Sequence, residues 1–106
     1  MTRYTSQTFV YTVGGDFDVA PILKMTPAAS AFNLQCEGDG VDGTYTLKIK
    51  NRNFDSISYV TIKEKELTED EAYKVHNQIT LYGDMIVEIT DGTATVGKVL
   101  VTINYD

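Results

Sequence analysis

Acidic side chains in two glycine-rich stretches are this sequence's main candidates for metal chemistry. They are Asp16, Asp18, Glu37, Asp39 and Asp42. Carboxylate oxygens at this density can hold calcium, although their spacing is not that of an EF-hand loop. Tight turns also select aspartate and glycine, because both residues suit the backbone conformations that turns require. We therefore expect plain turns without metal ligands, and calcium binding stays the open alternative.

The single histidine and the single cysteine do not stand in patterns that predict catalysis. Nucleophilic hydrolysis needs a nucleophile, a base and an orienting group, and no nucleophile motif lies near His76. Cys36 falls on an inward strand position, where a thiol behaves as a small apolar group. One cysteine forms no internal disulfide, and with one histidine it assembles no zinc site. We predict no catalytic residue, no cofactor and no enzyme activity.

The charge balance and the apolar pattern argue against two classes of partner. Nine basic side chains oppose fifteen acidic ones, which gives a formal charge of −6. That is the wrong sign for binding a phosphate backbone. Residues 1–6 contain no apolar signal-peptide core, and no stretch approaches the roughly 18 apolar residues of a membrane helix. We expect no direct nucleic-acid partner, no membrane partner and no cleavable secretion signal.

The composition predicts that strands, rather than helices, position the acidic, histidine and cysteine side chains discussed above. The chain has 14 Thr, 10 Val and 8 Ile against 6 Leu and 6 Ala, a bias towards β-branched residues that favours sheets. Apolar residues alternate with polar ones in four segments, 7–13, 31–37, 44–50 and 98–105, as expected for strands with one buried face. Tyr45, Leu47, Ile49 and Cys36 are predicted to point inward. In the other cases the alternation gives a shared apolar face, formed by Phe9, Tyr11 and Val13, by Phe32 and Leu34 with Cys36, and by Val99, Val101 and Ile103.

Further strands are predicted at 19–25, 56–63, 78–81 and 84–90. Pro21 lacks a backbone donor, so the segment 19–25 should be a short edge strand. Glycine-rich turns at 38–43 and at Asp91-Gly92 predict hairpins, and Tyr82-Gly83 separates the strands on its two sides. Thr68 and Glu71 have the spacing of a capping box, which predicts a short helical turn.

Length and strand spacing together predict the fold class. A chain of 106 residues supports one hydrophobic core. About seven to eight strands at this spacing predict an all-β, single-domain antiparallel β-sandwich of jelly-roll or Ig-like type, with a small barrel as the alternative. At most one short helical turn is expected near 68–76. Residues 1–8 are predicted to form a polar N-terminal arm and residues 9–106 the sandwich.

Tyrosines provide the candidate contact residues. Seven Tyr and no Trp supply amphipathic side chains of the kind favoured at interfaces, although Tyr45 and Tyr59 are expected in the core. Tyr4 lies in the polar arm and is expected to become ordered on docking. Phe9 and Tyr11 lie in a first strand with two apolar faces, which suggests addition of this strand to a neighbour's sheet. The predicted partner-binding residues are therefore Tyr4, Phe9 and Tyr11.

The order of features over residues 20–105 resembles that of small β-sandwich accessory proteins of tailed bacteriophage particles, of the capsid-decoration and head-fibre kind. The matching stretches are Ala20–Leu23, Phe32–Gln35, Asp42–Thr44, Leu47–Asn51, Met85–Ile89, Gly97 and Val99–Asn104. The chain has Asn51–Asp55 where many such proteins carry Ser-Asn-Asp-Gly, and it lacks the Trp that often follows. The resemblance implies a non-enzymatic virion protein, made in the bacterial host cytoplasm, that binds capsid or tail proteins and forms homo-oligomers.

A carbohydrate-binding or adhesion module is the alternative from another class. A β-sandwich suits that role equally well, and exposed aromatic residues with Asp- and Asn-containing loops could line a sugar site. The absence of a tryptophan for stacking on a sugar ring counts against it.

Overall fold

The described part of the chain forms eight β-strands. The computed structural model describes residues 5–29, 32–52, 58–77 and 81–105. The strands are β1 (Thr5–Thr12), β2 (Ile22–Ala29), β3 (Phe32–Asp39), β4 (Thr44–Arg52), β5 (Tyr59–Thr68), β6 (Ala72–Asn77), β7 (Leu81–Asp91) and β8 (Lys98–Tyr105). Within these ranges there is no helix of the length and apolarity that crossing a membrane requires.

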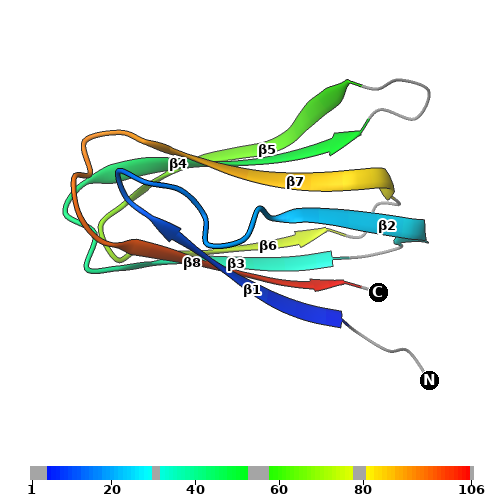
Figure 1. Ribbon diagram of the computed structural model, residues 1–106, viewed down its shortest axis with the longest axis horizontal. Coiled ribbons are helices and arrows are strands. Elements are labelled where there is room, and N and C mark those ends of the chain that lie inside the picture. Colours follow the sequence, from blue (N-terminus) through cyan, green and yellow to red (C-terminus); the bar gives the residue numbers. More distant parts are fainter. Residues whose placement is uncertain (1–4, 30–31, 53–57, 78–80, 106) are drawn as a thin grey trace.

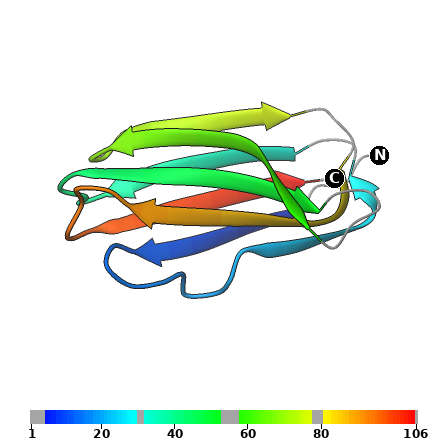
Figure 2. The ribbon, with the colours of Figure 1, turned by 90° about the horizontal axis from the view of Figure 1, so that it is seen from above.

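Two four-stranded antiparallel sheets lie face to face (Figure 1). One has the order β1-β8-β3-β6 and is called the β8 sheet below. The other has the order β2-β7-β4-β5 and is called the β7 sheet. The chain changes sheet at most of its connections, so that strands close in sequence lie in different layers, as Figure 2 shows from above. This arrangement is that of a jelly roll, which confirms the predicted all-β sandwich and selects one of the two types expected.

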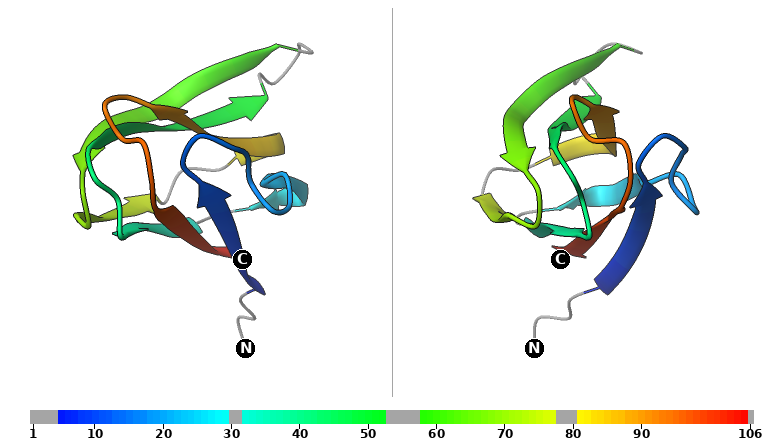
Figure 3. Two further views of the ribbon diagram at one scale, coloured as in Figure 1. Left: turned by 60° about the vertical axis from the view of Figure 1, so that its left-hand side comes forward. Right: turned by 90° about the vertical axis from the view of Figure 1, so that its left-hand side faces the viewer.

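The core lies between the sheets and follows the alternation of the sequence. All twelve residues that share these apolar faces are buried, and none is more than 7% exposed. The β7 sheet adds Leu23, Leu67, Met85 and Val87 to the same cluster. The view from the end of the sandwich shows the two layers that enclose it (Figure 3). Apolar burial of this kind is the main source of stability for a one-domain fold.

Both predicted hairpins are wrong. Residues 32–37 and 44–50 do form strands, but β3 pairs with β6 and β8, whereas β4 pairs with β5 and β7. The connection 40–43 therefore crosses from one sheet to the other. The connection after Asp91 crosses in the same way, because β7 and β8 belong to different sheets. Turn residues permit a reversal of the chain, but they do not determine which strand becomes the partner.

The predicted helical turn at Thr68–Glu71 is also wrong. The amide of Thr68 does donate to Glu71 Oε1 at 3.3 Å, as in a capping box. However, Glu69 has φ of 54°, and the amide of Glu71 donates to the Thr68 carbonyl at 3.1 Å, so the segment is a tight turn between β5 and β6. The left-handed conformation of Glu69 prevents a helix from starting here.

Three smaller expectations have different outcomes. β2 does lie at a sheet edge, as Pro21 indicated. Tyr82 and Gly83 do not interrupt a strand, because β7 runs through them, and residues 78–80 of the predicted strand 78–81 lie outside the described residues. Residues 5–8, assigned to the polar arm, pair with β8 as part of β1, whereas residues 1–4 lie outside the described residues.

Candidate functional site

The outer surface of the β8 sheet carries two rows of mostly uncharged polar side chains. Strand pairing aligns Ser6, Asn104, Asn33 and His76 in one row and Thr8, Thr102, Gln35 and Lys74 in the next. These eight residues are called the polar face. They come from all four strands of the sheet, and only Lys74 carries a charge when His76 is neutral. The polar face is therefore a broad surface of hydroxyl and amide groups.

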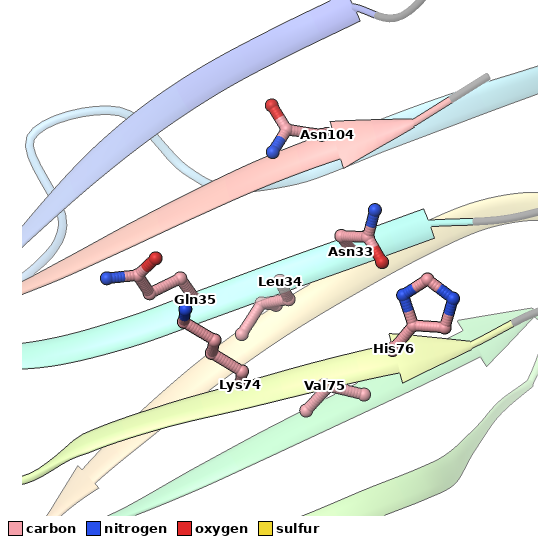
Figure 4. Close-up of a pocket in the computed structure, with 7 residues that line it drawn as sticks. All are labelled: Asn33, Leu34, Gln35, Lys74, Val75, His76 and Asn104. Atoms are coloured by element: carbon pink, nitrogen blue, oxygen red, sulfur yellow. The ribbon is translucent and has the colours of Figure 1, made fainter.

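A shallow depression of about 300 Å³ lies on the polar face, where β3 runs between β6 and β8. Figure 4 shows the side chains of Asn33, Gln35, Lys74, His76 and Asn104 around it. Leu34 and Val75 complete its lining. Amide groups both donate and accept hydrogen bonds, so this depression can bind a polar, uncharged group on a partner or a ligand.

A second depression, of about 270 Å³, opens between β5 and β6 at the side of the sandwich. It shares Lys74, Val75 and His76 with the first and adds Ile62, Lys63 and Tyr73. The Lys65 ammonium lies 5.8 Å from the centre of the Tyr73 ring and covers this side. His76 therefore stands between two shallow depressions, on an exposed strand position rather than on a loop or a helix end.

The outer surface of the β7 sheet differs in its charge. Lys48 pairs with Glu64 at 3.6 Å and Lys50 pairs with Glu88 at 3.0 Å. Exposed ion pairs of this kind contribute little stability but keep a surface strongly hydrated. The polar face thus differs in its chemistry from the outer surface of the β7 sheet, and it costs less to dehydrate on contact with a partner because charged groups hold water most strongly.

Four connections meet at one end of the sandwich and are called the loop end: residues 13–18, 40–43, 69–71 and 92–97. In Figure 1 they lie opposite the two termini. Asp42 accepts hydrogen bonds from the Thr95 amide at 2.6 Å, from the Thr95 hydroxyl and from the Val96 amide at 3.1 Å. These bonds, first that of the Thr95 hydroxyl, lower the pKa of Asp42 to about 2.

Other carboxylates at or beside the loop end also accept hydrogen bonds from a neighbouring segment. Asp91 accepts from the Tyr11 hydroxyl at 2.7 Å and from the Gly14 amide at 2.8 Å, and Asp70 accepts from the Val41 amide at 3.2 Å. Burial, followed by the bond to Asp91, raises the pKa of Tyr11 to about 12. These contacts tie the four connections together.

The predicted acidic candidates for calcium are not brought together as a ligand set. Asp18 accepts hydrogen bonds from the Val10 amide at 3.0 Å and the Val19 amide at 2.7 Å, and Asp42 binds the 92–97 segment as described. Within the described ranges, no three or more His, Cys, Asp or Glu side chains are grouped as a metal site would need. Backbone amides thus donate to Oδ1 of both Asp18 and Asp42, which is typical of turn residues.

The predicted partner residues lie in different surroundings from those expected. Phe9 and Tyr11 are each 5% exposed and belong to the core, so their side chains do not form an outer surface. Tyr4 lies outside the described residues. The strand that carries Phe9 and Tyr11 does lie at a sheet edge, so the backbone part of the strand-addition hypothesis stands.

Two further candidate side chains are also located. Cys36 is fully buried, and burial raises the pKa of its thiol to about 12, in keeping with an inert core residue. Tyr45 is in the core as predicted, whereas Tyr59 is half-buried and donates from its hydroxyl to Asp84 Oδ2 at 3.1 Å. Tyr59 was expected in the core, and its position on the edge strand β5 explains the difference.

Sequence reasoning missed the polar face as a unit. The alternation does place Asn33 and Gln35, and likewise Thr102 and Asn104, on the faces opposite the apolar ones in their segments. Their proximity depends on the pairing of β3 with β8, which no local pattern specifies. The role of Asp91 was missed for the same reason, because its partner Tyr11 belongs to the other sheet.

Comparisons with known proteins identify similar folds but do not identify a family for this chain. The chain matches no protein-family profile and no curated protein sequence. Solved structures that it resembles include PirA, with 17% identity, a TM-score of 0.57 and coverage of 100% of this chain and 95% of that one. The Yersinia pseudotuberculosis-derived mitogen has 15% identity, a TM-score of 0.55 and coverage of 97% and 86%.

A protein of the disulfide-linked pili formed by Bacillus endospore appendages is similar at 12% identity, with a TM-score of 0.51 and coverage of 97% and 86%. At these identities the similarity shows a shared fold alone. The comparisons thus support one part of the resemblance to bacteriophage accessory proteins, namely the fold of a small jelly-roll β-sandwich.

Proposed function

We propose that this protein is a non-enzymatic accessory structural protein of a bacteriophage particle that binds capsid or tail proteins through its sandwich surface. The observation that carries the proposal is the polar face, a broad surface with one charged residue on an otherwise acidic molecule. Such a surface can form hydrogen bonds with a partner without the cost of burying many charges. The resemblance over residues 20–105 supplies the phage context.

The rest of the molecule supports this role. The connections of the loop end are fixed to each other by hydrogen bonds, so little conformational entropy is lost when a neighbour docks against the sandwich. The acidic side chains of the loop end keep free subunits soluble. The pilus protein of endospore appendages has the same fold, which indicates that the architecture is compatible with assembly into larger structures.

Mass spectrometry of gradient-purified particles tests the proposal. Peptides of this chain are expected to migrate with the major capsid protein, and the copy ratio distinguishes capsid decoration from a tail position. Gln35→Arg places a large charged side chain on the polar face, and Thr90→Arg places the same side chain on the exposed outer surface of the β7 sheet. The Gln35 variant should be lost from particles and the Thr90 variant retained. Absence of the wild-type chain from particles would reject the virion role.

A carbohydrate-binding or adhesion module is the second candidate, favoured by the depression that Asn33, Gln35 and Asn104 line. Amide side chains hydrogen-bond well to sugar hydroxyl groups. A glycan array, run with and without calcium, tests this function. Binding that Asn33→Ala abolishes would support it, and no binding on the array would reject it. Calcium-dependent binding would instead direct attention to the acidic loops.

A further inference from the structure

Each sheet of the sandwich has two edge strands, and the four edges are not equally protected. An edge strand presents unpaired amides and carbonyls that can pair with another chain, and proteins block such edges with charges, prolines, bulges or coverage. The edges are β1 and β6 in the β8 sheet and β2 and β5 in the β7 sheet. Their sequences and contacts show which edge is open to a partner.

Three of the edges carry protective features. β2 contains Pro27, and its register with β7 shifts between Met25 and Ala29. β5 contains four consecutive charged residues, 63–66, and its pairing with β4 is interrupted by a bulge. β6 is the shortest strand of the eight, and the Lys65 side chain lies over its Tyr73.

β1 lacks these features. Its sequence, Thr5–Thr12, contains neither a charged residue nor a proline, and its register with β8 runs over eight residue pairs without a shift. A strand of this kind is an open template for pairing with another strand.

Only the second half of the β1 edge is covered. The Val10 amide donates to Asp18 Oδ1, the Val10 carbonyl accepts from the Asp18 amide at 2.8 Å, and the Thr12 amide donates to the Asp16 carbonyl at 3.1 Å. Backbone groups of alternate residues point to the same side of a strand, so those of Ser6 and Thr8 also point away from β8. Within the described ranges, no hydrogen bond covers Ser6 or Thr8 on this side.

We propose that a second copy of this chain occupies the open edge, with the two β1 strands antiparallel and Gln7 opposite Gln7 of the other copy. In this register Ser6 and Thr8 of each copy exchange backbone hydrogen bonds with Thr8 and Ser6 of the other. Pairing extends from residue 5 to residue 9 in both copies and ends where Asp18 covers Val10. The open stretch is thus complementary to itself, as a two-fold symmetric contact requires.

The charge distribution is compatible with a second copy in the antiparallel arrangement. Each copy carries a formal charge of −6, and its loop end holds many of the acidic residues. β1 runs from the end of the sandwich that holds the termini towards the loop end (Figure 1). Antiparallel pairing therefore places the two loop ends at opposite extremes of the dimer, where repulsion between them is screened by salt. The paired strands contribute no charge of their own.

The dimer has a consequence for the polar face. The two β8 sheets become one eight-stranded sheet, and the polar faces of both copies join across the new strand pair. The proposal does not depend on a phage role, because it rests on the edge of one sheet. Sedimentation velocity over a concentration series distinguishes the two ideas: a dimer that is absent from particles would leave this proposal standing while rejecting the virion role.

The test combines sedimentation with two matched variants. The wild-type chain should show a reversible monomer–dimer equilibrium. Thr8→Pro removes an amide that faces away from β8, and proline is tolerated in an edge strand at such a position. The loss of this donor in both copies should weaken dimerisation at least about tenfold. Thermal unfolding of Thr8→Pro close to that of the wild type establishes that the variant is folded.

Gln7→Cys provides a second measurement that does not need the proline variant. The two Gln7 residues would form a non-hydrogen-bonded pair, whose Cα atoms lie about 4.5 Å apart, within the range of a disulfide. Mild oxidation should link Gln7→Cys chains as covalent dimers, whereas Gln35→Cys, exposed in the middle of the same sheet, should form no disulfide-linked dimer. A wild-type chain that remains monomeric at about 1 mM, or equal cross-linking of both variants, would overturn the proposal.

Discussion

The hydrogen bond from the Tyr11 hydroxyl to Asp91 Oδ1 joins the two sheets, because β1 belongs to the β8 sheet and β7 to the β7 sheet. Its donor and acceptor lie 2.7 Å apart, and Asp91 is held in place by a second bond from the Gly14 amide. Tyr11→Phe removes the hydroxyl and keeps the ring, whose centre lies 5.3 Å from that of Phe17. The substitution therefore isolates the bond between the sheets.

The expected loss of stability on removing this hydrogen bond follows from the charge of Asp91 and the partial exposure of the pair. A hydrogen bond to a charged group contributes about 1.5–3 kcal/mol, and Asp91 is half-buried, so the lower part of that range applies. Tyr11→Phe should lower the free energy of unfolding by about 1–2 kcal/mol. Asp91→Asn weakens the same bond, so a double-mutant cycle should give a coupling energy of about 1 kcal/mol.

Equilibrium unfolding in urea at neutral pH, followed by circular dichroism, measures both quantities. Tyr73→Phe is the matched control, because Tyr73 is half-buried and its hydroxyl makes no hydrogen bond within the described ranges. The control should change the free energy of unfolding by less than about 0.5 kcal/mol. The reasoning would be refuted if Tyr11→Phe cost no more than Tyr73→Phe, or if the coupling energy were close to zero.

Three further predictions follow from individual residues. Since the pKa of Tyr11 is about 12 in the folded chain and about 10 when unfolded, its stabilising contribution is complete below pH 10 and is lost as pH rises towards 12. This loss of stability amounts to about 2–3 kcal/mol. Urea unfolding at stepped pH should show a smaller decrease in the free energy of unfolding for Tyr11→Phe than for the wild type. The Tyr45 hydroxyl is buried beside the Cys36 thiol, a weak hydrogen-bonding group, and no stronger partner contacts it within the described ranges. Tyr45→Phe should therefore raise the midpoint of thermal unfolding, by about 1 kcal/mol in free energy, and a lower midpoint would contradict this. Gly97 has φ of 115°, and a Cβ there would lie 2.6 Å from the 40–41 backbone, so Gly97→Ala should cost more than about 2 kcal/mol. Gly14→Ala is the control, because its φ is also positive but its Cβ would meet nothing within 4 Å; equal losses in urea unfolding would refute the steric argument.

Local sequence patterns predicted which residues are buried, because alternation on a strand depends only on neighbours in the chain. Leu34 and Cys36 in β3 and Leu47 and Ile49 in β4 illustrate this success. The same patterns failed to predict strand order. The glycines between β3 and β4 permit both a hairpin and a crossing between sheets, and only the packing of the whole core selects the crossing.

The Thr68–Glu71 turn shows a different limit. The side-chain bond of a capping box does form there, but the backbone geometry is that of a turn between two strands. A short motif indicates which hydrogen bonds its side chains can make, whereas the surrounding strands determine the conformation of its backbone. The polar face needed even more non-local information, because Asn33 and Asn104 become neighbours only through the pairing of β3 with β8.

The pairing of Thr5 with Tyr105 also determines how the molecule responds to mechanical load. β1 and β8 are antiparallel neighbours, and the start of β1 lies beside the end of β8. A force that pulls these two points apart acts along the hydrogen bonds, which lie perpendicular to the strands, and therefore opens the pair one bond at a time. The sandwich should peel at low force from this corner, whereas a load applied between the start of β1 and the loop end of β8 would shear all eight residue pairs together.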